Sequence, residues 1–207
     1  METRWLGSHI PYQEALALQQ ELVVTRQQNK IPDTILLLEH TPVYTIGRIR
    51  DQSSLRDTTQ LPHPVVEINR GGQATYHGPG QLVGYPILDL STRGKDLHAY
   101  LRNLEEALIR TLSDFDVTAS RKEGLTGVWI EERKIAALGI GVRKWVSMHG
   151  FALNITQESL QGFAHITPCG IDGVTTTCLH QESTKTPSVE ETGTVVTTHL
   201  QSLLQAN

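Results

Sequence analysis

Two spacings of hydrophobic side chains alternate along the chain and predict interleaved helices and strands. Residues 11–29 place apolar side chains three and four positions apart, which is the buried stripe of an amphipathic helix. Leucines at the same spacing predict a second helix over residues 96–115, with Asp96 as its N-cap. Ser188 and Glu191 have the capping-box spacing, which predicts the start of a last helix.

Short runs of β-branched and leucine residues predict strands between these helices. The predicted strands cover residues 34–39, 43–46, 65–69, 81–90, 127–131, 135–142 and 145–155. The polar tripeptide Glu132-Arg133-Lys134 has the length of a hairpin turn, so its flanking strands are expected to be antiparallel. Helices interleaved with such a hairpin predict an α+β fold, a mixed sheet flanked by helices. No linker or repeat interrupts the pattern, and we expect one domain over residues 1–207.

Composition narrows the functional classes. Charged residues make up 19% and hydrophobic residues 38% of the 207 residues, with a formal net charge of −4, which argues against disorder and against nucleic acid as a partner. No apolar run approaches the ~20 residues of a membrane span, and the first residues lack the pattern of a signal peptide. We therefore expect a cytoplasmic protein with no membrane partner. The nine histidines show no metal-binding spacing, and we expect neither a metal nor a cofactor.

A glycine-rich segment over residues 70–81 carries the first sign of chemistry. Four glycines and a proline follow a predicted strand, and paired glycines let a backbone approach a ligand closely. The segment is neither a Walker A loop nor a dinucleotide-binding G-x-G-x-x-G. Its glycine content alone is equally typical of a surface loop with tight turns, so both interpretations stay open at this point.

The pattern R-G-G-x-x-T-x-H-G-P-G-Q in that segment resembles the signature of the lipoyl(octanoyl) transferases. Residues 133–140, 145–154 and 166–171 are similar to three further segments of that family, in the same order. The resemblance covers roughly residues 35–180. It implies the fold that these transferases share with lipoate-protein ligases and with the catalytic domain of biotin-protein ligases.

The resemblance implies a catalytic pair, Cys169 and Lys134. Cys169 is the expected acyl-thioester nucleophile, because a thiolate exchanges readily with an incoming thioester. A free thiol is only a few per cent ionised at neutral pH, so a nearby Lys134 ammonium would favour the thiolate and could transfer protons. Taken alone, Cys169 would more often be a small buried hydrophobe and Lys134 a solvated turn residue.

The resemblance also implies an acyl pocket with small and apolar walls. The residues expected to line it are Arg70, Gly71, Gly72, Gln73, Ala74, Thr75, Tyr76, His77, Ala137, Leu138, Gly139, Gly150, Phe151 and Ala152. His77 is expected to orient or protonate a reacting group, because the resemblance places it in the pocket, and hydrogen bonding of the loop is the alternative. His149 is expected to be a core histidine with satisfied hydrogen bonds. Cys178 lies in a β-like run and is interpreted as structural.

The function implied is transfer of an octanoyl group from octanoyl-acyl carrier protein to a lysine of lipoyl domains, the first step of endogenous lipoate synthesis. The expected acceptors are the apo-lipoyl domains of 2-oxoacid dehydrogenase complexes and the glycine cleavage H protein. The main alternative is an ATP-dependent lipoate- or biotin-type ligase, which needs no cysteine. A carrier-binding protein without activity and a thiol hydrolase are weaker alternatives.

Overall fold

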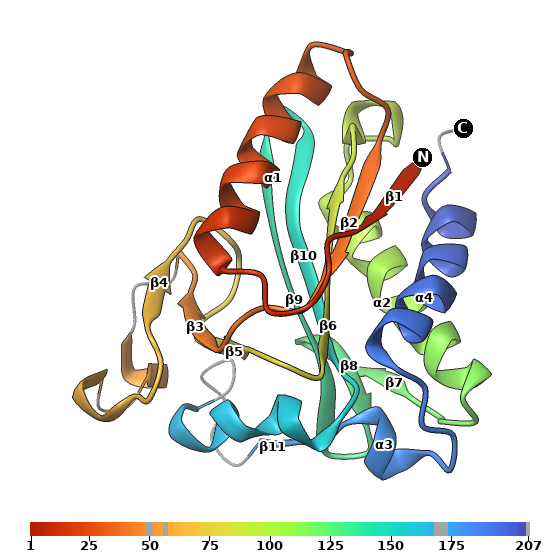
Figure 1. Ribbon diagram of the computed structural model, residues 1–207. Helices are drawn as coiled ribbons and strands as arrows, with labels where there is room; N and C mark the ends of the chain where they lie inside the picture. Colours follow the sequence, from red (N-terminus) through yellow and green to blue (C-terminus); the bar gives the residue numbers. More distant parts are fainter. Residues whose placement is uncertain (49–51, 56–57, 168–173, 206–207) are drawn as a thin grey trace.

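A mixed eight-stranded sheet forms the centre of the computed structural model, which describes residues 1–48, 52–55, 58–167 and 174–205 (Figure 1). Its strand order is β1-β2-β6-β10-β9-β8-β7, and β11 pairs with β9. The strands are β1 (Glu2–Trp5), β2 (Thr34–Leu38), β6 (Gln81–Ile87), β7 (Ser120–Lys122), β8 (Leu125–Ile130), β9 (Arg133–Arg143), β10 (Val146–Asn154) and β11 (Thr175–Thr176). The β1–β2 and β11–β9 pairs are parallel and the others antiparallel, which confirms the predicted mixed sheet.

A second, three-stranded sheet stands beside one end of the main sheet and comprises β4 (Val65–Glu67), β3 (Val43–Ile46) and β5 (Thr75–His77) in that order (Figure 1). The central strand β3 is parallel to β4 and antiparallel to β5. Strand β5 belongs to the glycine-rich segment, which the sequence pattern indicated as a connection between strands. Its three residues are too few for a periodic signal.

Helices cover both faces of the main sheet. Helix α1 (Tyr12–Gln27) lies on one face, whereas α2 (Leu97–Asp114) and α4 (Val189–Leu203) lie side by side on the other (Figure 1). The short helix α3 (Leu179–Glu182) follows β11. Four 3-10 segments complete the described elements: Gln52–Leu55, Thr58–Gln60, Leu90–Thr92 and Gln157–His165. Within the described ranges, no helix has the length and apolar character to span a bilayer.

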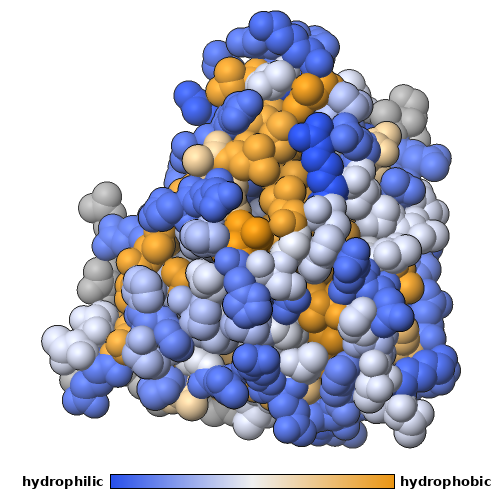
Figure 2. Space-filling model, viewed as in Figure 1, coloured by the Kyte–Doolittle hydropathy of each residue, from blue (hydrophilic) through white to orange (hydrophobic). Residues whose placement is uncertain are grey.

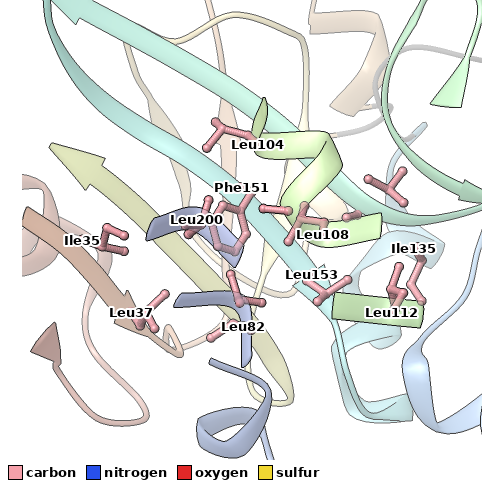
Figure 3. Packing of buried hydrophobic residues seen from close by; sticks show 14 of the residues in the cluster. Ile35, Leu37, Leu82, Leu104, Leu108, Leu112, Ile135, Phe151, Leu153 and Leu200 are labelled. Carbon is pink, nitrogen blue, oxygen red and sulfur yellow. The ribbon is translucent and has the colours of Figure 1, made fainter. Parts of the chain in front are cut away.

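The central strands are apolar throughout because both of their faces are covered. In β2, Ile35 and Leu37 point toward α2 and α4, while Leu36 and Leu38 point toward α1. Figure 3 shows the larger cluster, in which leucines of α2 and α4 interdigitate with Phe151 and neighbouring sheet residues. In the view of Figure 2, an apolar area lies over α1 and the adjoining strands, framed by hydrophilic side chains.

The predicted helix caps are confirmed. The Asp96 carboxylate accepts hydrogen bonds from the backbone N–H groups of His98 and Ala99 at 2.9 and 3.0 Å. Ser188 and Glu191 form a complete capping box at the start of α4. Local side-chain chemistry sets these boundaries, which is why the sequence alone could locate them.

The predicted hairpin turn was placed too far along the chain. Strand β8 ends at Ile130 and β9 begins at Arg133, so the turn consists of Glu131 and Glu132, and Glu131 takes up its positive φ of 51°. Lys134 therefore lies inside a strand instead of at a hairpin tip, and only 4% of its surface is exposed. A two-residue turn that needs a left-handed backbone leaves Arg133 and Lys134 to the ladder.

Replacing the cap Asp96 by Ala should lower the free energy of unfolding by about 1 kcal/mol, because two N–H groups in the first turn of α2 lose their acceptor. Asp96→Asn keeps an acceptor oxygen and is the matched control, expected to stay near the wild-type value. Urea unfolding of the three proteins measures both effects. Equal losses in the two variants would show that the carboxylate charge, and not the cap hydrogen bonds, stabilises this end.

Candidate functional site

A hollow opens between the glycine-rich segment, α1 and the paired strands β9 and β10. It is lined by Tyr12, Arg70, Gly72, Gln73, Ala74, Thr75, His77, Tyr85, Ala137, Leu138, Gly139, His149, Gly150, Phe151 and Ala152. The structure thus brings together the expected residues of three separate segments, with the exceptions of Gly71 and Tyr76.

The strand geometry of β5 explains why Tyr76 is not in the lining. Successive side chains of a strand point to opposite faces, so Thr75 and His77 face the hollow and Tyr76 faces away from it. The Tyr76 ring packs edge-on against Phe163, with ring centroids 5.8 Å apart. Gly162 makes room for it, since a Cβ there would lie 2.1 Å from the ring. Tyr76 therefore belongs to the small core beside the hollow.

Gly71 contributes through its backbone. Its N–H donates to the Ile140 carbonyl of β9 at 3.0 Å, and its own carbonyl oxygen would lie 2.9 Å from a Cβ at Gly139. The glycine-rich segment can lie this close to β9 because Gly139 has no side chain. Gly72 continues the turn at a positive φ of 84°, which glycine adopts at little cost.

The buried guanidinium of Arg70 fastens this loop to β3. Its Nη2 donates to the carbonyl and hydroxyl oxygens of Thr45 and to the Gln73 carbonyl, each at 2.9 Å. Its Nη1 donates to the Gly71 carbonyl at 2.8 Å. Arg70 thus holds the wall of the hollow by satisfying several backbone carbonyls at once.

His77 is a fixed, neutral ring in that wall. Its Nδ1 lies 2.9 Å from Gln81 Oε1, and its Nε2 lies 3.5 Å from the Thr45 hydroxyl. Burial, and next the proximity of His40, lower the pKa of His77 to about 3. The ring is therefore uncharged at neutral pH, and Nδ1 donates to the amide oxygen. These contacts favour hydrogen bonding within the wall over the orienting role.

Tyrosines and a further histidine extend the uncharged polar wall. His40 Nδ1 lies 2.8 Å from the Ile10 carbonyl, so this nitrogen donates, and Nε2 accepts from the Tyr85 hydroxyl at 2.7 Å. Burial lowers the pKa of His40 to about 4 and raises the pKa of Tyr12 to about 12. The Tyr12 and His77 rings stack with centroids 6.1 Å apart. Sequence analysis missed Tyr12 and Tyr85, since each reads as an ordinary core residue of its element.

His149 lines the hollow as well as being buried. Its backbone has a positive φ of 57°, and its N–H donates to Gln19 Oε1 at 2.8 Å. Burial, and next the charge of Arg70, lower the pKa of His149 to about 4. Within the described residues, its Nδ1 has no hydrogen-bond partner. The prediction that His149 is buried is therefore confirmed, and the prediction that its hydrogen bonds are all satisfied is wrong.

The Lys134 side chain lines a second hollow, which lies beside the first. This smaller hollow is lined by Lys134, Ala136, Asn154, Phe163 and Thr176 and shares Thr75, Ala137 and Ala152 with the larger one. Lys134 Nζ donates to the Thr126 carbonyl at 2.9 Å and lies 5.2 Å from the centre of the Trp129 ring. The two hollows adjoin each other at these shared residues of β5, β9 and β10, and together they are called the recess.

Of the two cysteines, Cys178 lies within the described residues and Cys169 does not. Cys169 lies outside the described residues, so its distance from Lys134 is not defined. Cys178 is fully buried, and burial raises the pKa of its thiol, which makes it unreactive as a nucleophile. The structural interpretation of Cys178 is confirmed.

Sequence comparison places the chain among acyl-transferring enzymes. Residues 11–201 match the family described as the lipoyl protein ligase A/B catalytic domain. Octanoyltransferase from Syntrophotalea carbinolica is 50% identical over 99% of this chain and 95% of its own length. Octanoyltransferase from Geobacter sulfurreducens is 52% identical over 87% of this chain and 75% of its own length.

Solved structures of low identity share the fold. A bi-partite lipoate protein ligase from Thermoplasma acidophilum superposes with a TM-score of 0.73 at 17% identity, covering 99% of this chain and 84% of the other. Biotin protein ligase from Aquifex aeolicus gives a TM-score of 0.62 at 17% identity, covering 98% and 70%. The implied ligase-like fold is therefore confirmed. Together with the sequence relatives, it shows that the chain belongs to the lipoyl protein ligase A/B catalytic-domain family and, within it, to the octanoyltransferases, which are acyltransferases.

Proposed function

We propose that residues 1–207 act as one catalytic domain that moves an octanoyl group from octanoyl-acyl carrier protein to a lysine of a lipoyl domain, with Cys169 holding the group in between. The observation that carries this proposal is the recess itself. A buried Lys134 side chain lines this recess, none of whose described lining residues carries a carboxylate, in a chain about 50% identical to octanoyltransferases. This reaction is the first step of endogenous lipoate synthesis.

The proposed transfer proceeds in two balanced steps. The Cys169 thiolate attacks the thioester carbonyl carbon, the bond to the carrier sulfur breaks, and the departing thiolate takes a proton from the Lys134 ammonium. The amine of the acceptor lysine then attacks the Cys169 thioester. The new amide forms, Cys169 leaves as a thiolate, and the proton released by the amine returns to Lys134. Lys134 thus gives up a proton in the first step and regains one in the second, and at no point carries the acyl group.

The histidine rings that line the hollow suit an apolar chain. Burial keeps the rings of His77 and His149 neutral at physiological pH, so an acyl chain displaces no strongly hydrated group from them. Each methylene buried contributes about 0.8 kcal/mol, which is enough to make the depth of the recess select chain length. Ala137 and Ala152 lie opposite each other in the β9–β10 ladder and both line the recess, where their small side chains leave room for the chain.

Register supports the pairing of Cys169 with Lys134. In the β11–β9 ladder Thr176 lies opposite Lys134, and Thr176 follows Cys169 by only seven positions. Thr167, two positions before Cys169, is held by a hydrogen bond from its N–H to the Ser54 carbonyl at 2.8 Å.

The proposed donor is octanoyl-acyl carrier protein. The proposed acceptors are apo-lipoyl domains of 2-oxoacid dehydrogenase complexes and the glycine cleavage H protein, in the cytoplasm, where thiols stay reduced.

An ATP-dependent ligase is the second candidate, because the fold is shared with a lipoate protein ligase. Such an enzyme would activate a free acid as an acyl-adenylate and would need no cysteine. Cofactor dependence therefore separates the two candidates.

Incubation with octanoyl-acyl carrier protein, without ATP, should add one octanoyl group to the protein, located at Cys169 by peptide mapping. The matched variants are Cys169→Ser and Cys178→Ser. The first should lose transfer, because an alcohol is not ionised at neutral pH, and the second should keep it, because Cys178 is buried away from the hollow. Intact-protein mass reports both. Transfer that appears only with ATP and free octanoate would establish the ligase instead.

Replacing Lys134 by Ala should slow acyl loading of Cys169 by about 10²–10⁴-fold, since the thiolate loses its neighbouring charge and the leaving thiol its proton donor. Lys134→Arg keeps a charge but cannot release a proton at neutral pH, so it should restore alkylation of Cys169 more than it restores turnover. Stopped-flow loading and iodoacetamide alkylation across pH give the two rates. Wild-type loading by Lys134→Ala would remove the lysine from the mechanism.

A further inference from the structure

The carboxylate of Glu105 lies buried between α2 and β8, the strand whose Thr126 carbonyl accepts a hydrogen bond from Lys134. Its side chain is 1% exposed. Oε1 accepts a hydrogen bond from the backbone N–H of Gly127 at 3.0 Å. Oε2 accepts from Arg102 Nη1 at 2.6 Å and from Arg121 Nε at 3.1 Å. One buried carboxylate thus joins two arginines to the backbone of β8.

Gly127 is the residue against which the Lys134 side chain lies. A Cβ at Gly127 would be 2.5 Å from Lys134 Cε and 3.0 Å from Nζ, and the φ of Gly127 is 139°. The preceding carbonyl, that of Thr126, accepts the hydrogen bond from Lys134 Nζ. The peptide between Thr126 and Gly127 therefore offers its carbonyl to the ammonium and its N–H to Glu105. Moving this peptide would move the ammonium.

We propose that Glu105 is a positioning residue for Lys134, which it acts on through the Thr126–Gly127 peptide without touching the acyl group. This inference rests on the proposed function, in which Lys134 stabilises the Cys169 thiolate. Its chemical basis is that a hydrogen bond to a charged acceptor is shorter and stronger than a neutral one. It also polarises the peptide, so that the Thr126 carbonyl becomes a better acceptor for the ammonium.

A purely structural role explains the arrangement less well. A buried carboxylate is costly to desolvate, and apolar side chains often replace buried ion pairs without loss of stability. The neighbouring carboxylate, Glu106, binds Arg110 of the same helix and Arg121 of β7, with no hydrogen bond to β8 among the described residues. In the part of the chain that the structure describes, Glu105 is the member of this charge cluster that binds the backbone holding Lys134.

The charged groups around Lys134 come from α2, β7, the hairpin turn, β9 and α3. Glu105 approaches from α2 through the Gly127 peptide, and Lys122 of β7 lies 4.7 Å from the centre of the same Trp129 ring that Lys134 contacts. Lys122 is paired with Glu132 of the hairpin turn. Arg133, next to Lys134, is paired with Glu182 of α3. Neither Glu132 nor Glu182 is substituted in the test, so these charges stay constant.

Glu105→Asp and Glu106→Asp form a matched pair of variants. Each loses one methylene on the same helix and each can still pair with Arg121, but only the first withdraws an acceptor from the Gly127 N–H. Three quantities are measured: the pH midpoint of Cys169 alkylation, the rate of acyl loading, and the rate at which an acylating reagent labels the Lys134 amine. Thermal unfolding shows that each variant is folded at the assay temperature.

Glu105→Asp should shift the alkylation midpoint of Cys169 to higher pH, slow acyl loading about tenfold and speed labelling of Lys134. KM for the carrier should stay near its wild-type value, since no carrier contact is altered. Glu105→Gln keeps an acceptor for Gly127 but removes its charge, so its loading rate should lie between those of Glu105→Asp and the wild type. Glu106→Asp should match the wild type in all three quantities.

Two results would overturn the inference. One is a Glu105→Asp protein with an unchanged alkylation midpoint and unchanged labelling of Lys134. The other is an equal shift in Glu106→Asp, which would assign the effect to surface charge. Failure of the proposed function looks different: Lys134→Ala would then leave the alkylation midpoint unchanged, while the labelling of Lys134 would still respond to Glu105→Asp.

Discussion

The close approach of the glycine-rich segment to β9 is the constraint on which the site depends. The Gly71 N–H binds the Ile140 carbonyl at 3.0 Å, and the Gly71 carbonyl occupies the space that a side chain at Gly139 would need. Across the ladder, Gly139 pairs with Gly150, and Ala137 pairs with Ala152. These small residues keep one face of the β9–β10 pair open. On the other face, Phe151 and Leu153 anchor the same strands to α2 and α4 (Figure 3).

Burial then separates the polar groups of the site into two kinds. The histidines and tyrosines of the wall are held neutral, because desolvation disfavours their charged forms. Lys134, by contrast, donates from its buried Nζ to a backbone carbonyl and lies against an indole face. This arrangement suits the proposed thioester exchange, in which an apolar chain would lie beside the neutral rings and its reacting end beside Lys134.

The sequence predicted the parts of the fold that local chemistry determines. Asp96 and the Ser188–Glu191 pair mark helix starts by side-chain hydrogen bonds, and the all-apolar β2 indicates a strand covered on both faces. Short strands such as β1, β5 and β7 were not predicted, because three or four residues are too few to show a hydrophobic periodicity. The hairpin was misplaced by two residues, since a polar tripeptide does not reveal which of its residues adopts a positive φ.

For the site, family resemblance located most of the residues that line the hollow, but the tertiary contacts had to come from the structure. Tyr12 lies far from the glycine-rich segment in the chain and reaches the hollow only because α1 packs over β6 and β10. Glu105 reads as an ordinary helix residue, and only its hydrogen bond to Gly127 connects it to Lys134. Such connections depend on packing between distant segments, which spacing along a chain does not encode.

The rate at which the acyl-enzyme passes its octanoyl group to the acceptor decides whether Cys169 carries that group during turnover. Octanoylated protein, freed of donor and of nucleotide, would be mixed rapidly with an apo-lipoyl domain, and the loss of the adduct followed with the gain on the acceptor. If Cys169 carries the group, transfer should be stoichiometric and no slower than steady-state turnover. Discharge slower than turnover, or discharge to water without modification of the acceptor, would contradict a Cys169 intermediate.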